Sequence, residues 1–293
     1  YARENGRNGC SAVSNNFTLS TYVITASAGP NGTISPLGPV AVNSGANQAF
    51  TIAANSLFHI SDVLVDGGSV GAVSNYTFTT VTANHTIAAS FAPDTVLVSV
   101  QTSPAGRSVR VDGVLLSAPQ VFNWVSGSTH TIATDSVQTG AAGTRYLYQS
   151  WSDAGAISHS VSPSTNTTYT ATFGTQYFLT MTAGTGGTVS PASDWKDSGA
   201  LVPISATANT GYSFSGWTGS GTGSFTGATN PVNITMNGPI TQTAAFTPNP
   251  ISITVTTSPV GRSIIVDDTV YTSPHIFNWL AAQTHTISVD SIQ

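Results

Sequence analysis

Apolar and polar residues alternate in short runs along most of this chain. A period of two places successive side chains on opposite faces of a strand, so it predicts half-buried β-strands. Clear examples are YVITASA (22–28), NQAFTIAA (47–54) and THTIATDS (129–136). Turn signals rich in Gly, Pro, Asn and Asp separate the runs, and long helical periodicity is absent. The pattern predicts an all-β chain of short strands.

The sequence repeats itself after 155 residues. Residues 98–138 align with 253–293 without a gap, and about half of the aligned positions are identical. Tyr22 and Tyr177 open another pair of related segments at the same spacing. A fixed period of this kind is typical of tandem modules, here in the order A, B, A′, B′.

The predicted modules are small and follow one another closely. We assign residues 1–20 to an N-terminal extension and candidate donor strand, 21–93 to A, 94–175 to B, 176–248 to A′ and 249–293 to a partial B′. A core of about 70–80 residues is marginal alone, so we expect small β-sandwich or β-grasp-like modules packed end to end. Short linkers at 92–95, 173–176 and 247–250 favour an extended rod.

B′ is shorter than B. B continues after Gln138 with a stretch that has no counterpart in B′, and the N-terminal segment SAVSNNFTLST (11–21) loosely resembles the end of B. We therefore expect the array to be completed from outside these residues. Either the extension of a next subunit adds a strand to B′, or more of the same polypeptide continues it.

Charged residues are unusually scarce. Asp, Glu, Lys and Arg make up 6% of the chain, against roughly 25% in an ordinary soluble domain. The net charge is −5 and no basic face is evident, which argues against nucleic-acid binding. No apolar run approaches the roughly 18 residues needed to span a bilayer. No signal peptide is evident, and the start at Tyr1 suggests a processed chain or a fragment.

The sequence predicts no enzyme. One G-x-S-x-G match occurs at 67–71, but it lies between strands, whereas a hydrolase elbow needs a strand, a turn and a helix. Glu4 is the only glutamate, so a pair of glycosidase carboxylates is not expected. No catalytic residues and no cofactor are predicted.

Histidines and aspartates recur at fixed places in the modules. His85, His130 and His285 each precede Thr-Ile and are expected to be hydrogen-bonded at a strand start rather than to bind metal. Asp66, Asp112 and Asp267 stand where a type I′ hairpin turn prefers Asp. The Asp267–Asp268 and Asp194/Asp197 pairs could be considered for calcium, but acidic residues are too sparse to supply a full set of oxygen ligands.

Arginines and tryptophans recur as well. Arg107 and Arg262 are expected to clamp a turn to a carbonyl or to the Asp of the same module. Four tryptophans are expected to be core anchors, although exposed ones would suit stacking on sugars. They are Trp124, Trp151, Trp217 and Trp279.

Two kinds of residue are candidates for attachment. Cys10 is the single cysteine, so it is either a free thiol or a site of intermolecular bridging or attachment. Candidate N-glycosylation sequons occur at Asn16, Asn31, Asn75, Asn84, Asn166 and Asn233.

A and A′ share a family-like motif. A contains GPNGTISP (29–36) and closes with NHTIAASF (84–91), and A′ contains GTGGTVSP (184–191) and closes with QTAAF (242–246). This pattern resembles the divergent InlB B-repeat, or bacterial repeat domain, of large bacterial and archaeal surface proteins. B resembles a related divergent type. The resemblance implies β-rich stalk, spacer or adhesive modules of secreted or cell-wall proteins, without shared catalytic or binding residues.

Two functional hypotheses follow. The first is a structural subunit or segment of an extracellular fibre, stalk or filament, whose partners are other copies of itself in head-to-tail order or further repeats of the same chain. The second is an adhesin or carbohydrate-binding spacer of a larger secreted protein, with glycans as partners. Both place the chain outside the cell or on its surface.

Overall fold

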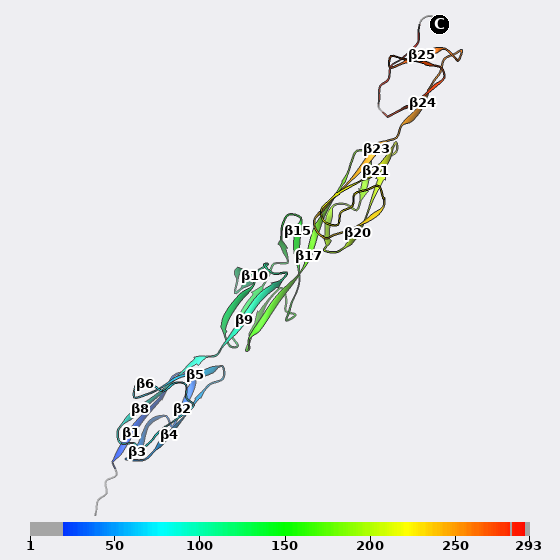
Figure 1. The fold of residues 1–293 in the computed structure, drawn as a ribbon. Coiled ribbons are helices and arrows are strands. Elements are labelled where there is room, and N and C mark those ends of the chain that lie inside the picture. Colours follow the sequence, from blue (N-terminus) through cyan, green and yellow to red (C-terminus); the bar gives the residue numbers. More distant parts are fainter. Residues whose placement is uncertain (1–19, 282, 291–293) are drawn as a thin grey trace, which may run out of the picture. The chain divides into compact units, whose positions relative to one another are not determined.

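The computed structural model describes residues 20–281 and 283–290. Every helix or strand assigned in them is a β-strand (Figure 1), which confirms the predicted all-β class. Within these residues no helix is long and apolar enough to cross a membrane. The strands form two compact units, one of residues up to Ser99 with 121–130 and 160–168, the other of the remaining residues.

Module A consists of two sheets. The larger has the strand order β3-β1-β8-β5-β6 and the smaller the order β2-β4-β7. β1 and β8 run parallel, whereas β1–β3 and β5–β8 are antiparallel. The strands are β1 Thr21–Ala28, β2 Gly32–Ser35, β3 Gly38–Asn43, β4 Gln48–Ala54, β5 Phe58–Val65, β6 Gly68–Ser69, β7 Asn75–Phe78 and β8 His85–Pro93.

Both sheets of A contribute to one core. Ile24 on β1, Phe50 on β4 and Ile87 on β8 are fully buried in the same cluster. Along β4, exposed Thr51 separates Phe50 from buried Ile52. This alternation follows from the pleat of a strand and fits the expected small sandwich.

Module B contributes strands to both units. Its sheets have the orders β12-β9-β17-β15-β14 and β11-β10-β13-β16. Val100, Val109 and Ile132 are fully buried. The strands are β9 Thr95–Ser103, β10 Ser108–Val111, β11 Val114–Ser117, β12 Gln120–Val125, β13 His130–Ala133, β14 Val137–Thr139, β15 Thr144–Trp151, β16 Ser158–Val161 and β17 Thr167–Ala183.

One strand belongs to both B and A′. β17 runs without interruption through residues 173–176, where the sequence suggests a linker. Its first part pairs with β15 and its second part with β19 and β23. Gly174 pairs with Leu147 inside this ladder, so the glycine does not break the strand. B and A′ are therefore joined by continuous hydrogen-bonded strand.

A′ repeats the arrangement of A. β21 pairs with β23, β23 with β17, and a second sheet has the order β18-β20-β22. Leu179, Ile204 and Met236 are fully buried in one cluster. The strands are β18 Gly187–Ser190, β19 Asp194–Asp197, β20 Leu201–Ala208, β21 Tyr212–Ser220, β22 Val232–Thr235 and β23 Ile240–Pro248.

B′ repeats the first strands of B. β24 pairs with β27, and a second sheet has the order β26-β25-β28. At the spacing of 155 residues, these five strands correspond to β9 through β13. They are β24 Ile251–Val255, β25 Ser263–Val266, β26 Thr269–Thr272, β27 His275–Trp279 and β28 Ile287–Ser288.

Candidate functional sites

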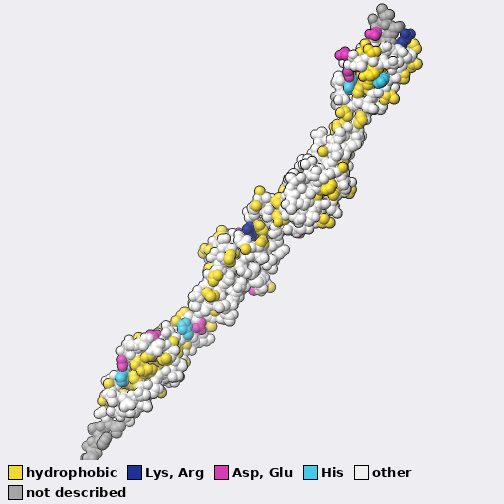
Figure 2. All heavy atoms as spheres, in the orientation of Figure 1, with side chains coloured by type: hydrophobic (Ala, Val, Ile, Leu, Met, Phe, Trp, Pro, Cys, Tyr) yellow, Lys and Arg dark blue, Asp and Glu magenta, His cyan; other side chains and the backbone are white. Residues whose placement is uncertain are grey.

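Equivalent apolar residues are buried in B but open to solvent in B′. Val98 and Ile132 of B are 0% exposed, whereas their counterparts Ile253 and Ile287 are 36% and 51% exposed. Apolar side chains gather on this end of the chain, around β24 and β25, in Figure 2. We call Ile251, Ile253 and Ile287 the open face of B′.

Strand β25 of B′ does not share this exposure. Ile264 and Val266 on β25 stay as buried as Val109 and Val111 of B, whereas the open face lies on β24 and β28. In B, the corresponding strands β9 and β13 have β17 and β16 as neighbours. The described part of B′ contains no counterpart of β14 through β17. Among the described residues, β24 has β27 as its strand neighbour and β28 has β25.

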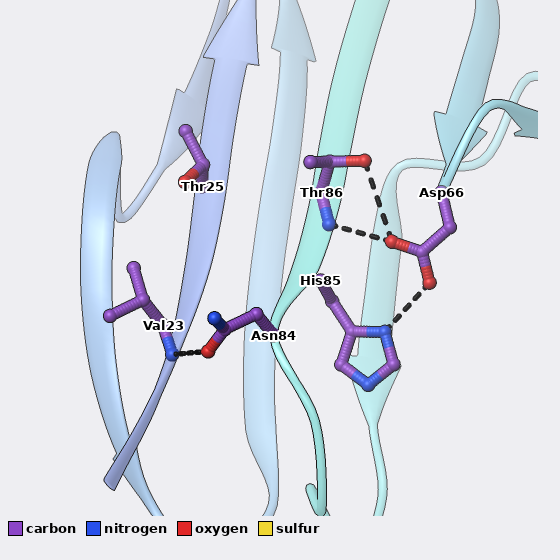
Figure 3. A pocket seen from close by; sticks show the side chains of 6 residues that line it. All are labelled: Val23, Thr25, Asp66, Asn84, His85 and Thr86. Carbon is purple, nitrogen blue, oxygen red and sulfur yellow. Dashed lines mark hydrogen bonds and ion pairs between the residues drawn. The ribbon is translucent and has the colours of Figure 1, made fainter.

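An Asp–His–Thr contact closes the hairpin turn of module A (Figure 3). Asp66 Oδ2 lies 2.7 Å from His85 Nδ1, and the Thr86 N–H donates to Asp66 Oδ1 at 2.7 Å. The hydrogen bond from His85, followed by the one from Thr86, lowers the pKa of Asp66 below its ordinary value. Asp66 and Gly67 both have positive φ, as a type I′ turn requires.

The same contact recurs in the B-type modules. In B′, Asp267 accepts from the Thr286 N–H and lies 2.6 Å from His285 Nδ1, which lowers the pKa of Asp267. In B, the Thr131 N–H donates to Asp112 at 2.8 Å. The expected roles of these aspartates in turns and of His85 and His285 at strand starts are confirmed.

The polar groups that line a pocket beside Asp66 hydrogen-bond to one another. Val23, Thr25, Asn84 and the Asp66–His85–Thr86 contact line it (Figure 3). Asn84 Oδ1 accepts the Val23 N–H at 2.8 Å, and both Asp66 carboxylate oxygens have partners. The polar groups hold strands together rather than converge on a ligand.

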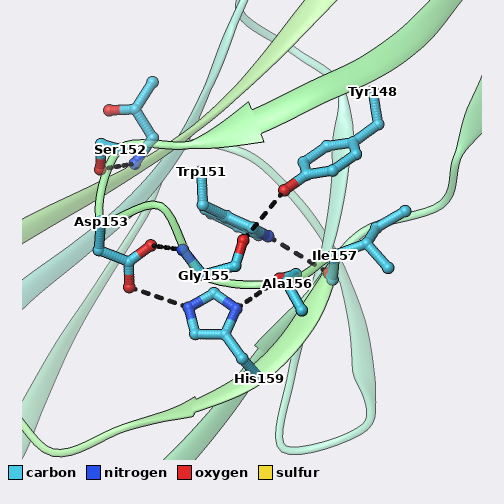
Figure 4. A network of polar contacts seen from close by, with 9 residues as sticks. Tyr148, Trp151, Ser152, Asp153, Gly155, Ala156, Ile157 and His159 are labelled. Atoms are coloured by element: carbon cyan, nitrogen blue, oxygen red, sulfur yellow. Dashed lines mark hydrogen bonds and ion pairs between the residues drawn. The ribbon is translucent and has the colours of Figure 1, made fainter.

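A second polar network closes the loop after β15 (Figure 4). His159 Nε2 lies 2.9 Å from Asp153 Oδ2, and His159 Nδ1 lies 2.6 Å from the carbonyl of Ala156. Burial raises the pKa of Asp153, but the Gly155 N–H and His159 outweigh it and give a net lowering. Buried Trp151 donates to the carbonyl of Ile157 at 3.3 Å. The network orders one loop of B.

The junction between B and A′ carries a chain of side-chain contacts. Arg145 Nε donates to Gln176 Oε1 at 2.8 Å, and Gln176 Nε2 donates to Asp197 Oδ1 at 2.8 Å. The Arg145 guanidinium also lies 4.5 Å from the ring centroid of Trp195. Strand β15 of B is thereby tied to β19 of A′ across β17.

A single residue ties module A to the start of B. The Asp94 N–H donates to the carbonyl of Leu57 at 2.9 Å, and the Asp94 carbonyl accepts the Ser126 N–H at 2.8 Å. Its carboxylate lies 2.9 Å from His59 Nδ1. The Asp94 side chain and backbone therefore bind both modules.

The junction between A′ and B′ repeats this arrangement with different side chains. Asn249, the counterpart of Asp94, donates its N–H to the carbonyl of Gly211 at 2.7 Å. Ser213 Oγ donates to Asn249 Oδ1 at 2.5 Å. Gly211, like Leu57, has positive φ. The backbone hydrogen bond to the A-type module is kept, and the His59–Asp94 contact is replaced by the Ser213–Asn249 hydrogen bond.

Most recurring tryptophans are core residues, as predicted. Trp151 and Trp217 are each 2% exposed and Trp124 is 7% exposed. Trp279 of B′ differs, because it is only partly buried. It stacks on Phe277 and on His285 at centroid distances of 5.1 and 4.1 Å.

The other polar candidates also have structural contacts. Ser69 of the G-x-S-x-G match donates to Asp62 at 2.7 Å in the β5–β6 hairpin, as expected for a turn. Arg107 lies 4.1 Å from the ring centroid of Tyr146, so its guanidinium stacks on an aromatic side chain, a contact that the sequence does not predict. Arg262, its counterpart in B′, accepts the Ser273 N–H through its backbone carbonyl.

Three of the four carboxylates considered for calcium, those of Asp194, Asp197 and Asp267, are engaged by neighbouring groups. Asp194 pairs with Lys196, whose hydrogen bond, with that of the Trp195 N–H, lowers the pKa of Asp194. Asp197 accepts from Gln176. Among the described residues, no three His, Cys, Asp or Glu side chains gather as metal ligands would.

The described sequon asparagines all lie at the surface. Asn84 and Asn166 are held by backbone N–H groups of Val23 and Leu97 at 2.8 Å. The five exposed ones are Asn31, Asn75, Asn84, Asn166 and Asn233. Asn16 and Cys10 lie outside the described residues, and glycosylation stays a prediction.

Comparison with known proteins gives one family match. Residues 22–95 and 177–250 each match the divergent InlB B-repeat domain. These segments coincide with A and A′ and make up just over half of the chain. A search of curated proteins finds no match.

Proposed function

Because the chain belongs to the divergent InlB B-repeat family through A and A′, we propose that it is a structural repeat protein of the cell surface, a segment or subunit of an extracellular fibre, stalk or filament. The observation that carries this proposal is the joining of its modules. β17 continues from B into A′. The backbone of Asp94 hydrogen-bonds to Leu57 of A and Ser126 of B, and the N–H of Asn249 donates to Gly211 of A′. Such junctions suit a spacer that must transmit force.

The surface chemistry supports the same role. Only 6% of residues are charged, and Figure 2 accordingly shows few charged side chains on the visible face. A surface of neutral polar groups changes little with the ionic strength of an outside medium, because few exposed charges are there to be screened. The extended rod stays a prediction that small-angle scattering would test.

A non-catalytic role is part of the proposal. The Asp–His contacts at Asp66, Asp153 and Asp267 resemble parts of catalytic sites, but each carboxylate also accepts a backbone N–H. The donors are Thr86, Gly155 and Thr286. A catalytic base needs free access to a substrate proton. These groups are instead used to close turns.

Head-to-tail assembly belongs to the proposed function. The open face of B′ lies on strands whose counterparts in B have strand neighbours. A strand added from another subunit would be a heterologous contact, which extends into a filament because the two surfaces differ. Continuation of the same polypeptide would cover the face as well.

The second candidate is an adhesin or carbohydrate-binding spacer. The stacked Phe277, Trp279 and His285 of B′ favour it, because Trp279 is partly exposed while its counterpart Trp124 is buried. A glycan array distinguishes the two roles. Binding that is lost in Trp279→Ala and kept in Trp195→Ala would support the adhesin.

Surface labelling of the native source tests the main proposal. Antibodies against the purified chain should label intact cells or shed fibres, and external protease should remove the label. Label that appears only after the cells are permeabilised would contradict the surface role. Antibody absorbed with the purified chain is the control.

A further inference from the structure

Two core positions that hold apolar side chains in A hold polar ones in A′. The antiparallel pair β21–β23 matches β5–β8 of A residue by residue, including the register shift. Trp217 and Gln242 of A′ stand where A has Val63 and Ile87, and all four residues are at most 2% exposed. Burying a polar group in a core is unfavourable unless the group is hydrogen-bonded. The paired change therefore needs hydrogen-bond partners inside A′.

Trp217 and Gln242 face the same side of their sheet. Trp217 pairs with Ala244, and Gly219 pairs with Gln242. Because Trp217 and Gly219 are two residues apart in one strand, they lie on one face, and Gln242 is the diagonal neighbour of Trp217. Long and aromatic side chains reach such a diagonal neighbour. The indole and the amide therefore lie next to each other in the core of A′.

Gly219 provides the space that the Gln242 amide occupies. A Cβ atom on Gly219 would lie 2.6 Å from Gln242 Oε1 and 2.5 Å from the Phe225 carbonyl oxygen, whereas A has Val65 at this position. Gln242 Nε2 donates to the same Phe225 carbonyl at 3.1 Å. A carbonyl accepts only from the nitrogen end of an amide, so this bond identifies Gln242 Oε1 as the remaining acceptor.

One donor and one acceptor remain unpaired in this part of the core. Among the described residues, Trp217 Nε1 and Gln242 Oε1 have no hydrogen-bond partner, and both atoms are buried. The indole nitrogen only donates and the amide oxygen only accepts. Leaving both unpaired in a core is costly. A single water molecule satisfies both atoms, because it accepts one hydrogen bond and donates another.

We propose that the core of A′ binds one water molecule between Trp217 and Gln242. The Trp217 indole N–H donates to the water oxygen, and the water donates one proton to Gln242 Oε1. The Phe225 carbonyl lies beside the same amide and has a second lone pair for the other proton of the water. About three hydrogen bonds of this kind are typical of a water molecule buried in a folded protein.

The water site belongs to the loop that distinguishes A′ from A. After β21, residues 221–231 fold back on the strand, and Trp217 and Gly227 exchange backbone hydrogen bonds of 2.8 and 3.1 Å. Phe225 of this loop packs against the A′ core. In A, β5 instead continues into the short β5–β6 hairpin. The bound water therefore links the loop to β23 from the core side.

Nuclear magnetic resonance of the full chain with ¹⁵N-labelled tryptophan tests the proposal. Trp151 is the internal control, because it is also 2% exposed but its Nε1 donates to the Ile157 carbonyl at 3.3 Å. In a rotating-frame spectrum, the Trp217 indole proton should show a water cross-peak of opposite sign to the diagonal, which distinguishes a held water from proton exchange. The Trp151 indole proton should show none.

Two isoleucine variants test the role of Gln242. Gln242→Ile removes the acceptor and introduces the residue type that A has at Ile87, so the water cross-peak of Trp217 should be lost. Thr241→Ile is the matched control, because Thr241 is exposed on the opposite face of β23 and its replacement should leave the cross-peak unchanged. A Trp217 indole signal away from the position of an unfolded chain shows that A′ stays folded.

Three results would overturn the proposal. They are a Trp217 indole without a water cross-peak in the unaltered chain, an equally strong cross-peak at Trp151, and a Trp217 cross-peak that persists in Gln242→Ile. A direct hydrogen bond between Trp217 and Gln242 would give the first result. If Gln242→Ile prevents A′ from folding, the comparison of Trp217 with Trp151 in the unaltered chain still decides.

Discussion

The ring of Phe91 packs directly on Gly32. A Cβ atom on Gly32 would lie 2.2 Å from the ring's Cζ, and Gly187 meets Phe246 in the same way at 2.2 Å. These glycines open the Gly-Thr-Ile-Ser and Gly-Thr-Val-Ser strands of A and A′, and the phenylalanines lie in the closing strands. The contact explains why both modules have a glycine at the start of the Gly-Thr-Ile-Ser or Gly-Thr-Val-Ser strand and a phenylalanine in the closing strand.

Replacing Gly32 by Ala should therefore destabilise module A. The added methyl group must displace the Phe91 ring, which we expect to cost about 1–3 kcal/mol as overpacking does. Urea denaturation of the full chain measures it. Gly68→Ala is the control, because a Cβ atom on Gly68 would lie 3.5 Å from its nearest neighbour, the Val65 carbonyl oxygen. Adding Phe91→Leu to Gly32→Ala should recover part of the lost stability. A double variant no more stable than Gly32→Ala alone would contradict the contact.

The Asp66 hairpin contact should make module A sensitive to acid. His85 and the Thr86 N–H lower the pKa of Asp66 in the folded chain, so its carboxylate stabilises the fold above the unfolded pKa of about 3.9. That contribution is lost as the pH falls through the lower folded pKa. The free energy of unfolding of the unaltered chain and of Asp66→Asn should therefore converge once the pH lies below the folded pKa of Asp66. An NMR titration that places Asp66 at or above the value of an unstructured peptide would refute this.

Removing Arg145 should loosen the junction between B and A′. The side chain bonds to Gln176 and lies over Trp195, and a cation–π contact at a partly exposed site contributes about 0.5–1 kcal/mol. Arg145→Ala should speed amide exchange in β19. Amide exchange in β19 of Arg145→Lys should be nearly as fast as in Arg145→Ala, because lysine lacks the planar guanidinium group. Lys196→Ala serves as the control for loss of a nearby positive charge, and equal effects of the two Ala variants would count against the junction contact.

The open face predicts unequal protection of repeated strands. Amides of β24 and β28 should exchange with deuterium faster than those of β9 and β13, because exposed strands at a sheet edge open more easily. Amides of β25 and β10 should exchange at similar rates, since Ile264 is buried as fully as Val109. Hydrogen exchange read by mass spectrometry compares the three pairs of strands within one sample. Equal protection of β24 and β9 at high dilution would contradict the difference.

The repeat and its local turns could be predicted from the sequence. The alternation of apolar residues predicts the strands, and Asp before Gly predicts the hairpin turns at Asp66 and Asp112, which both have positive φ. The cores around Trp151 and Trp217 follow from the recurrence of aromatic residues. These features depend on neighbours in sequence or on the period itself.

Contacts between distant strands could not be predicted. Residues 173–176 contain a glycine and lie between modules, which suggests a linker, yet pairing with β15 keeps them in strand. Arg145 stands far in sequence from Trp195, and Arg107 from Tyr146. No local pattern specifies which side chains meet once strands pair. The shortness of B′ predicts an incomplete module, but it does not predict that Ile251, Ile253 and Ile287 are the exposed residues.

A structure of B′ in material taken from the native source tests the account most directly. We predict a further β-strand paired along β24, with apolar side chains covering Ile253 and Ile287. A B′ module whose β24 edge stays bare in the native assembly, with both isoleucines open to solvent, would contradict it.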